Sequence, residues 1–189
     1  MISGVVLAAG TGSRFGGTKQ IAVVNGKPLA QHAIDALDDA GVDEIVVVTG
    51  HDAVKVASAL ALPTQARIAY NAAFKDGQAT SLAAAIHALD DDSEAAVILM
   101  ADQPGVTAVV IRRLMERFRS TRKQVVRAMY DDGPGPSLLS REIYAEAGHL
   151  HGDVGARILI ASHPEWVEDV AVEADVPGDV DTPQDLEGL

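Results

Sequence analysis

Two cations lie in a glycine-rich stretch that directly follows the first apolar run of the chain. Residues 6–19 read Val-Leu-Ala-Ala-Gly-Thr-Gly-Ser-Arg-Phe-Gly-Gly-Thr-Lys, and Arg14 and Lys19 are the cations. Glycines allow positive φ angles, so that successive backbone N–H groups can face the oxygens of a phosphate. Two cations so close together would hold a polyphosphate in a protein of net charge −12. We expect a phosphate-binding loop rather than a turn that serves only chain geometry.

This loop matches neither of two common nucleotide-binding patterns. A Walker loop needs Gly-x4-Gly-Lys-Ser/Thr, and here Lys19 is followed by Gln20, which lacks the required hydroxyl. A dinucleotide fingerprint needs Gly-x-Gly-x-x-Gly, and Phe15 stands at its last glycine.

An acidic residue, Asp102, closes the most apolar run of the chain, residues 95–101. A charged residue in that place needs a partner, and a hard divalent cation is one candidate. Mg²⁺ takes one or two carboxylates together with phosphate oxygens. The alternative is that Asp102 caps the helix expected after Pro104.

Weaker signals follow the run at 66–70. Asn71 comes directly after it, and Gly77-Gln-Ala-Thr80-Ser81-Leu opens a helical pattern. The free N–H groups of that helix start, or the two hydroxyls, can contact a base or a ribose. The alternative is that Thr80 or Ser81 only caps the helix.

Short β-branched runs alternate with stretches of helical periodicity along the chain, which predicts β-α-β units. The fold class we expect is α/β, with a single doubly wound, mainly parallel sheet and helices on both faces. After the turn-rich segment 131–136 the pattern is less regular. The predicted strands are 2–7, 44–48, 66–70, 95–100, 124–129, 137–139 and 166–172, and the predicted helices are 28–40, 51–60, 78–89, 106–119 and 154–161. Ligands of such sheets bind beyond the C-terminal ends of the strands, where the loop and Asp102 would meet.

The composition limits the possible partners. The chain has 189 residues, 48% hydrophobic and 4% aromatic, with 27 acidic against 15 basic residues, so we expect one acidic globular domain. That charge balance argues against nucleic acid and anionic membranes as partners. The absence of cysteine excludes disulfides and thiolate chemistry. With no basic leader and no apolar run long enough to span a bilayer, we expect a cytoplasmic protein.

Taken whole, the loop resembles a known signature. Leu-Ala-Ala-Gly-x-Gly-Ser-Arg-Phe-Gly-x-x-Lys at 7–19, followed by Asn-Gly-Lys-Pro-Leu at 25–29, resembles the loop of nucleotidyltransferases with a glycosyltransferase-A-like fold, most closely the MobA-like NTP transferases. Met-Ala-Asp-Gln-Pro at 100–104, the segment 152–157 and Asp-Val-Asp-Thr-Pro-Gln-Asp-Leu at 179–186 resemble further motifs of that family.

The resemblance implies a nucleotide-diphospho-sugar transferase (Rossmann-like) fold. It also implies transfer of an NMP unit from an NTP to a phosphorylated acceptor such as molybdopterin, with Mg²⁺ as cofactor and release of pyrophosphate. The pattern Leu-Ala-Ala-Gly favours CTP over GTP, as in molybdenum cofactor cytidylyltransferases. A molybdoenzyme would be a client of such a protein.

The resemblance also implies roles for individual residues. Lys19, Arg14 and Asp102 would be catalytic, and Asp102 and Asp181 would hold the metal, with Asp179 as the competitor of Asp181. On its own, the sequence Asp181-Thr182-Pro183 equally predicts a helix start. The NTP-binding half would be 1–130, and the acceptor-binding and closing half 131–189. The nucleotide-binding residues would be Leu7, Ala8, Ala9, Gly10, Gly12, Arg14, Lys19, Asn71, Gly77, Thr80 and Ser81.

Two positions depart from the pattern of the family on the acceptor side. Gly135 stands where the family has His, and Val154 where it has Lys. The departures motivate two alternatives: an NAD(P)H-dependent oxidoreductase of the nicotine blue oxidoreductase type, or a non-catalytic nucleotide-binding partner of a molybdoenzyme. The retained Asp102 and Asp181 argue against the first, because hydride transfer needs no Mg²⁺. The retained Lys19 argues against the second.

Overall fold

The computed structural model describes residues 1–150, 152 and 156–188. Seven strands form one sheet in the order β5-β4-β1-β6-β8-β7-β9. All of them are parallel except β8, which runs antiparallel to both of its neighbours. The strands are β1 (Ile2–Ala8), β4 (Glu44–Thr49), β5 (Ala66–Tyr70), β6 (Ala95–Met100), β7 (Val125–Tyr130), β8 (Gly133–Ser140) and β9 (Val167–Val172).

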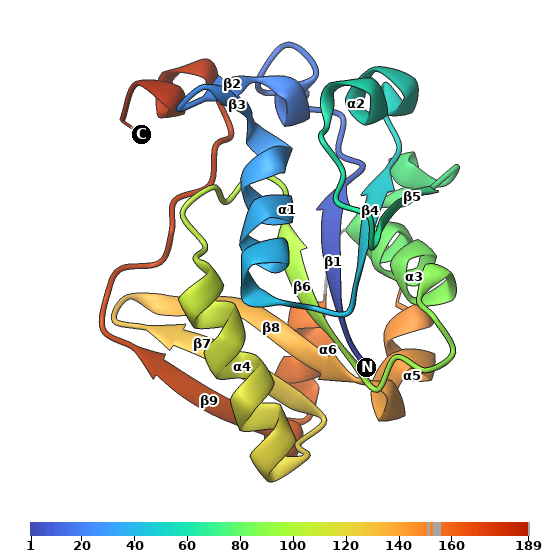
Figure 1. The fold of residues 1–189 in the computed structure, drawn as a ribbon, viewed down its shortest axis with the longest axis vertical. Coiled ribbons are helices and arrows are strands. Elements are labelled where there is room, and N and C mark those ends of the chain that lie inside the picture. The colour runs from blue at the N-terminus through green and yellow to red at the C-terminus, as the bar shows by residue number, and fades with distance from the viewer. Residues whose placement is uncertain (151, 153–155, 189) are drawn as a thin grey trace.

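Helices cover both faces of the sheet, which confirms the predicted fold class (Figure 1). Helices α1 and α4 lie on one face, and α3, α5 and α6 lie on the other. The helices are α1 (Leu29–Ala40), α2 (Ala53–Ala59), α3 (Gln78–Ala88), α4 (Ala108–Thr121), α5 (Tyr144–Gly148) and α6 (Ala156–Ser162). Among these helices, none combines the length and apolar character that crossing a bilayer requires.

The central strands are mostly apolar because they are buried on both faces. Every residue of β1 and β4 is buried. Along β1, Val6 packs on the side of α1 and α4, while Val5 and Leu7 pack on the side of α3. The predicted helix at 28–40 forms as α1 and ends at Gly41, whose φ of 76° closes it in the left-handed region.

The largest difference from the sequence prediction is β8, which begins at Gly133 within the segment interpreted as a turn. Gly133 and Pro134 pair only with β7, whereas Ser137, Leu138 and Leu139 pair with both β6 and β7. Pro134 and Pro136 are therefore tolerated, because this half of the strand has a neighbour on one side only. The helix predicted at 154–161 includes positions outside the described residues, and α6 accounts for the rest.

Several shorter features were not predicted, among them α5, the small hairpin of β2 (Val23–Val24) and β3 (Lys27–Pro28), and the 3-10 helix η1 (Lys19–Ile21). Another 3-10 helix, η5 (Pro183–Gly188), begins where the sequence predicts a helix start. After β9 the chain runs back along one side of the molecule to the carboxyl ends of β1 and β6 (Figure 1). We call residues 173–182 the C-terminal strap. Its Val180 is buried beside Leu29 and donates its N–H to the carbonyl oxygen of Asp102, 2.9 Å away.

Candidate functional site

The glycine-rich loop between β1 and η1 folds back on itself. The carbonyl oxygen of Gly12 accepts hydrogen bonds from the N–H groups of Phe15 (2.9 Å) and Gly16 (3.0 Å). Gly12 has a φ of +60°, and a Cβ there would lie 2.4 Å from the carbonyl oxygen of Gly17. Only glycine fits this position, because both the backbone angle and the space exclude a side chain.

The side chain of Gln20 hydrogen-bonds to the backbone at the start of this loop. Its side chain is buried and donates from Nε2 to the carbonyl oxygen of Gly10 at 2.6 Å. Its Oε1 atom is also buried and accepts no hydrogen bond from the described residues. Gln20 therefore fixes the direction of the Gly10 carbonyl, a role that the sequence analysis did not assign.

A compact ionic cluster stands beside the loop, at the carboxyl ends of β1 and β6. The ammonium of Lys19 lies 2.8 Å from Oδ2 of Asp102 and 3.2 Å from Oδ1 of Asp181. Nη1 of Arg14 lies 2.9 Å from the other oxygen of Asp181. Three distant parts of the sequence thus bring all four predicted catalytic and metal-binding residues together.

The environment of Lys19 keeps it charged. Burial opposes the charged form, but the hydrogen bonds and negative charges of Asp102 and Asp181 outweigh that effect and raise the pKa of Lys19. Only 14% of the Lys19 side chain and 19% of the Asp102 side chain are exposed, so this pair is shielded from solvent. The ammonium therefore neutralises a site that would otherwise hold two converging carboxylates.

The structure distinguishes the two candidates for the second acidic residue. Asp181 faces Lys19, whereas Asp179 accepts a hydrogen bond from Nε2 of Gln103 at 2.8 Å. The predicted helix start at Pro183 is confirmed as η5. A carboxylate oxygen of Asp185 accepts the N–H groups of Asp181 and Thr182, and these bonds lower the pKa of Asp185.

Asp102 does not cap a helix. Helix α4 begins at Ala108, with Thr107 at its N-cap position, so the capping alternative is wrong. Asp102 and Asp181 instead converge on one cationic position, as oxygen ligands of a divalent cation would. Among the described residues there is no group of three or more metal-binding side chains. A metal here would therefore be held by two carboxylates with water and phosphate oxygens, which suits Mg²⁺.

Asn71, Thr80 and Ser81 form one buried network at the start of α3. Nδ2 of Asn71 lies 2.9 Å from Oγ1 of Thr80 and 3.0 Å from Oγ of Ser81, and its Oδ1 accepts the N–H of Ala73. No side chain caps α3, which begins after Gly77, so the capping alternative is wrong here too. The network holds the 71–73 segment against the start of α3.

A cleft of about 430 Å³ opens on the α3 and α6 side of the sheet. Asp102, Gln103 and Asp179 lie at the end beside the ionic cluster, and Arg127 and Gly135 lie on the β7–β8 part of its floor. Between them the lining is mostly apolar, from Leu7, Leu82, Ile98, Met100, Pro136 and Ile160.

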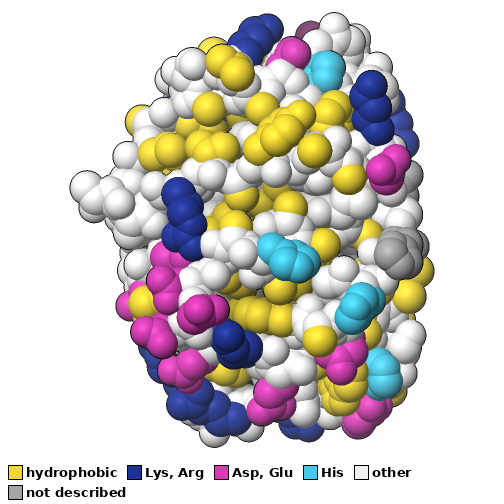
Figure 2. Space-filling model, turned by 90° about the vertical axis from the view of Figure 1, so that its right-hand side faces the viewer, with side chains coloured by type: hydrophobic (Ala, Val, Ile, Leu, Met, Phe, Trp, Pro, Cys, Tyr) yellow, Lys and Arg dark blue, Asp and Glu magenta, His cyan; other side chains and the backbone are white. Residues whose placement is uncertain are grey.

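A larger hollow of about 770 Å³ lies elsewhere, between α2 and the edge strand β5. Apolar side chains gather on this face of the molecule (Figure 2). The hollow includes Asp52 and Lys55 but none of the predicted site residues. Its size therefore does not make it the better candidate, because the charged groups that can bind a nucleotide lie at the strand ends.

A sequence profile of the MobA-like NTP transferase domain matches residues 4–167. The chain belongs to the MobA-like NTP transferase family. It is similar to Rv0371c of Mycobacterium tuberculosis H37Rv, with 32% identity, a TM-score of 0.87 and coverage of 99% of this chain and 95% of that one. A manganese complex of Rv0371c matches with 30% identity and a TM-score of 0.83, over 100% of this chain and 97% of that chain. The nucleotidyl transferase Mth528 of Methanothermobacter matches with 25% identity and a TM-score of 0.81, over 100% and 95% of the two chains.

A curated relative covers the same domain within a longer protein. The bifunctional protein GlmU of Burkholderia thailandensis is 31% identical over 140 residues, 73% of this chain and 30% of the relative. The chain therefore spans about a third of the length of the curated relatives that it matches.

Of the predicted nucleotide-binding residues, Leu7, Gly10, Gly12 and Lys19 line one small cavity of about 100 Å³ together with Asp102. Asn71, Gly77, Thr80 and Ser81 are not part of its lining and lie at the start of α3. Ala8 and Ala9 are buried directly before the loop, and the carbonyl oxygen of Ala9 accepts the N–H of His51.

The two departures from the family pattern fare differently. Val154 lies outside the described residues. Gly135 lines the cleft, and a Cβ there would lie 2.3 Å from Cε2 of Tyr130. The buried Tyr130 ring thus leaves no room for a histidine, and this stretch of the cleft floor is bare backbone. This contact has no signal in the sequence, because Tyr130 and Gly135 meet only through the pairing of β7 with β8.

Proposed function

We propose that the protein is a Mg²⁺-dependent nucleotidyltransferase that transfers CMP from CTP to a phosphorylated acceptor such as molybdopterin and releases pyrophosphate. The observation that carries the proposal is the convergence of Lys19 on Asp102 and Asp181 beside the glycine-rich loop. A molybdoenzyme is the client that this function would serve. The cytoplasmic location predicted from the sequence stays a prediction.

The chain supplies binding and charge for this reaction. Backbone N–H groups of residues 10–12, with Arg14 and Lys19, would bind the triphosphate. Asp102 and Asp181 would hold Mg²⁺, which neutralises charge on the phosphate oxygens when bound. The acceptor phosphate is already ionised and attacks the α-phosphorus, so no strong base is needed. Most of the rate would come from positioning and from Lys19 stabilising the developing negative charge.

The choice of nucleotide is part of the same proposal. The pattern Leu7-Ala8-Ala9-Gly10 is the one that resembles the CTP-using members of the family. Asn71, Gly77, Thr80 and Ser81 would contact the base or the ribose at the start of α3, where Asn71 joins the two hydroxyls. In this proposal residues 1–130 bind the NTP, and 131–189 bind the acceptor and close the site.

The ionic cluster favours the transferase over the two alternatives. An NAD(P)H-dependent oxidoreductase has no use for two carboxylates that converge at the phosphate loop. A protein that only binds nucleotide would not require a shielded lysine between them.

Calorimetric titration tests the proposal directly. Purified protein would be titrated with CTP, GTP and NADPH, each with Mg²⁺ and again with EDTA, and pyrophosphate release would be measured with candidate acceptors. We expect metal-dependent binding of CTP over GTP, lost in Asp102→Ala and kept in Asp179→Ala, its matched control. Binding of NADPH without metal, together with no binding of CTP, would refute the transferase and support the oxidoreductase.

A further inference from the structure

Arg127 is a cation of the acceptor-side cleft that the sequence pattern did not single out. It lies on β7, lines the cleft together with Gly135, and 24% of its side chain is exposed. The departures at Gly135 and Val154 remove a histidine and a lysine from the acceptor side of the family pattern. Arg127 offers the cleft a cationic group on a rigid strand instead.

Asp169 on the neighbouring strand fixes the orientation of Arg127. The two residues lie opposite each other in the parallel pairing of β7 and β9. Nε of Arg127 donates to Oδ1 of Asp169 at 2.8 Å, and Nη2 donates to Oδ2 at 3.0 Å. This double contact holds the plane of the guanidinium and removes most of its rotational freedom.

The contact with Asp169 leaves part of the guanidinium unused by that carboxylate. An arginine side chain has five N–H donors, and Asp169 takes two of them along the Nε edge. The end of the guanidinium, with both N–H groups of Nη1 and the second one of Nη2, can grip another anion in two-point fashion. Because Asp169 balances the charge, recognition here depends on geometry more than on long-range attraction.

The position of Arg127 separates it from the reacting atoms. Its partner across β8 is Ser137, which pairs in turn with Ile98 on β6. Two strand spacings therefore separate Arg127 from β6, on the order of 10 Å. The floor between them contains Ser137 and is otherwise apolar, with Ile98, Met100 and Pro136. An anion at Arg127 is too far away to be the phosphate that attacks at Asp102.

We propose that Arg127, held by Asp169, binds a second anionic group of the acceptor, at the opposite end of the cleft from the phosphate that attacks. The acceptor class is then an elongated molecule with a reacting phosphate at one end, an apolar or flat body, and an anionic substituent at least about 10 Å away. This inference rests on the proposed function in one respect only, namely that the other end of the acceptor carries the phosphate that reacts.

Alkyl phosphates of defined length make suitable probes. Hexyl phosphate and a series of α,ω-alkanediol bisphosphates with chains of four to ten carbons would be titrated into the protein by calorimetry. Mg²⁺ and a non-hydrolysable CTP analogue would be present throughout. We expect one bisphosphate of the series to bind about 10- to 100-fold more tightly than hexyl phosphate, as for hydrogen bonds to a charged group.

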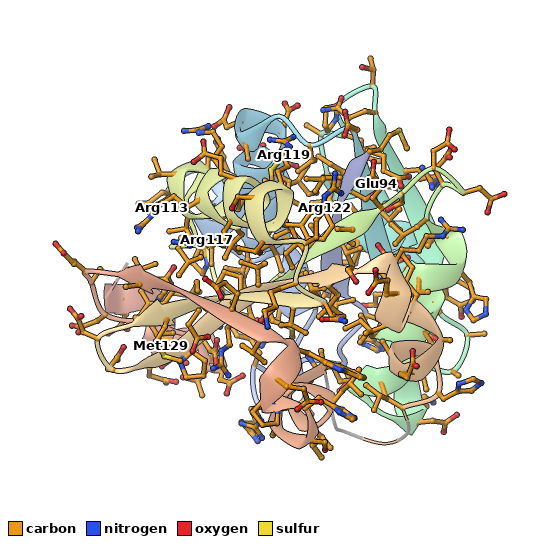
Figure 3. The ribbon with its side chains drawn as sticks, turned by 90° about the horizontal axis from the view of Figure 1, so that it is seen from below. Glu94, Arg113, Arg117, Arg119, Arg122 and Met129 are labelled. Carbon is orange, nitrogen blue, oxygen red and sulfur yellow. The ribbon has the colours of Figure 1, made fainter. Side chains whose placement is uncertain are left out.

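Substitutions test whether Arg127 is responsible for the preference for a bisphosphate over hexyl phosphate. Arg127→Ala and Arg127→Lys should abolish it, because lysine cannot make the two-point contact, and Asp169→Asn should reduce it. The matched control is Arg117→Ala, which breaks an ion pair with Glu168, the β9 residue next to Asp169. Arg117 lies on the α4 side of the sheet, whereas Met129 lies on the other side (Figure 3). Arg127 is two residues before Met129 on the same strand and so shares its side, which means that Arg117→Ala leaves the cleft face unchanged.

Two results would overturn the inference. One is the absence of any bisphosphate preference in the unaltered protein, and the other is a preference that survives in Arg127→Ala. Titration of CTP with Mg²⁺ in the same variants separates this outcome from failure of the proposed function. If CTP binds in a metal-dependent way and the preference is absent, only the role of Arg127 is refuted.

Discussion

The two ends of the site are built in different ways. At the nucleotide end, Arg14 and Lys19 are paired with Asp181 and Asp102, so each cation meets a carboxylate that a metal could take over. At the acceptor end, the carboxylate of Asp169 stays with Arg127, and an apolar floor separates the pair from the chemistry. A bound metal and nucleotide would replace the ion pairs of the first arrangement, whereas the ion pair of the second would stay in place when a ligand binds. In the proposed function, the common chemistry belongs to the first end, and selectivity for the acceptor to the second.

The sharpest test of this comparison is Lys19→Ala. Loss of the ammonium removes a charge from the developing transition state, so we expect pyrophosphate release to fall about 10²- to 10³-fold. Without its internal cation, the same variant should bind Mn²⁺ more tightly in the absence of nucleotide, as measured by calorimetry. Lys27→Ala is the control, because Lys27 pairs with Asp35 on the exposed surface of α1. Normal activity in Lys19→Ala would contradict the rearrangement.

Gly12→Ala tests whether the loop shape is needed at the nucleotide end. Both Gly12 and Gly16 have positive φ angles, so alanine costs about 1–2 kcal/mol of stability at either position. Only at Gly12 would the Cβ also meet a carbonyl oxygen, since nothing lies within 4 Å of a Cβ at Gly16.

We therefore expect Gly12→Ala to weaken CTP binding by at least about 10-fold, equivalent to 1.4 kcal/mol, in a calorimetric titration. Gly16→Ala should change thermal stability alone. Equal CTP affinities in the two variants would show that the loop adjusts freely.

At the acceptor end, Gly135→Ala should disturb packing rather than chemistry. The new methyl group would press on the Tyr130 ring, at a cost of about 1–3 kcal/mol in the free energy of unfolding. Gly148→Ala is the control, because a Cβ there meets nothing within 4 Å. Denaturant unfolding measures both variants. In a double-mutant cycle, Tyr130→Ala should relieve the cost, whereas additive effects would contradict the proposed contact.

The smallest effect concerns the attachment of α5 to the rest of the molecule, and it appears only at high pH. Burial raises the pKa of Tyr144 to about 12, while its hydroxyl lies 3.3 Å from Oγ of Ser93. Between pH 10 and 12 the unfolded chain loses the tyrosine proton first, so the folded state loses stability as the pH rises. We expect a loss of about 2 kcal/mol in the unaltered protein that is absent from Tyr144→Phe, measured by urea unfolding at each pH. Identical pH profiles would show that Tyr144 ionises normally.

The difference between the two ends also explains what the sequence could predict. The order and type of the main strands and helices follow from alternating periodicities, and the family motifs place Lys19, Asp102 and Asp181 in one site. The geometry then favours Asp181 over Asp179, because Gln103 holds the latter. That choice depends on a side-chain contact between residues far apart in the chain.

The acceptor end was less predictable because its contacts run across strands. Residues 133–136 are turn-forming types, so the sequence does not reveal that β8 begins at Gly133. Glycine and proline are tolerated in this part of the strand because β7 is the only described strand beside it. Arg127 occupies an ordinary alternating position of β7, so nothing in its spacing marks it. Its importance appears only once β9 places Asp169 opposite it.

The C-terminal strap has a consequence for biosynthesis. About 80 residues separate Asp102 from Asp181, so a growing chain carries the first carboxylate long before the second. At about 5–20 residues per second, the ribosome needs roughly 4–16 s to add that stretch. During this interval the sheet can begin to form around β1 and β6 while Lys19 has only one of its two partners. A nascent chain can therefore fold early and still lack the complete ionic cluster until Asp181 has been added.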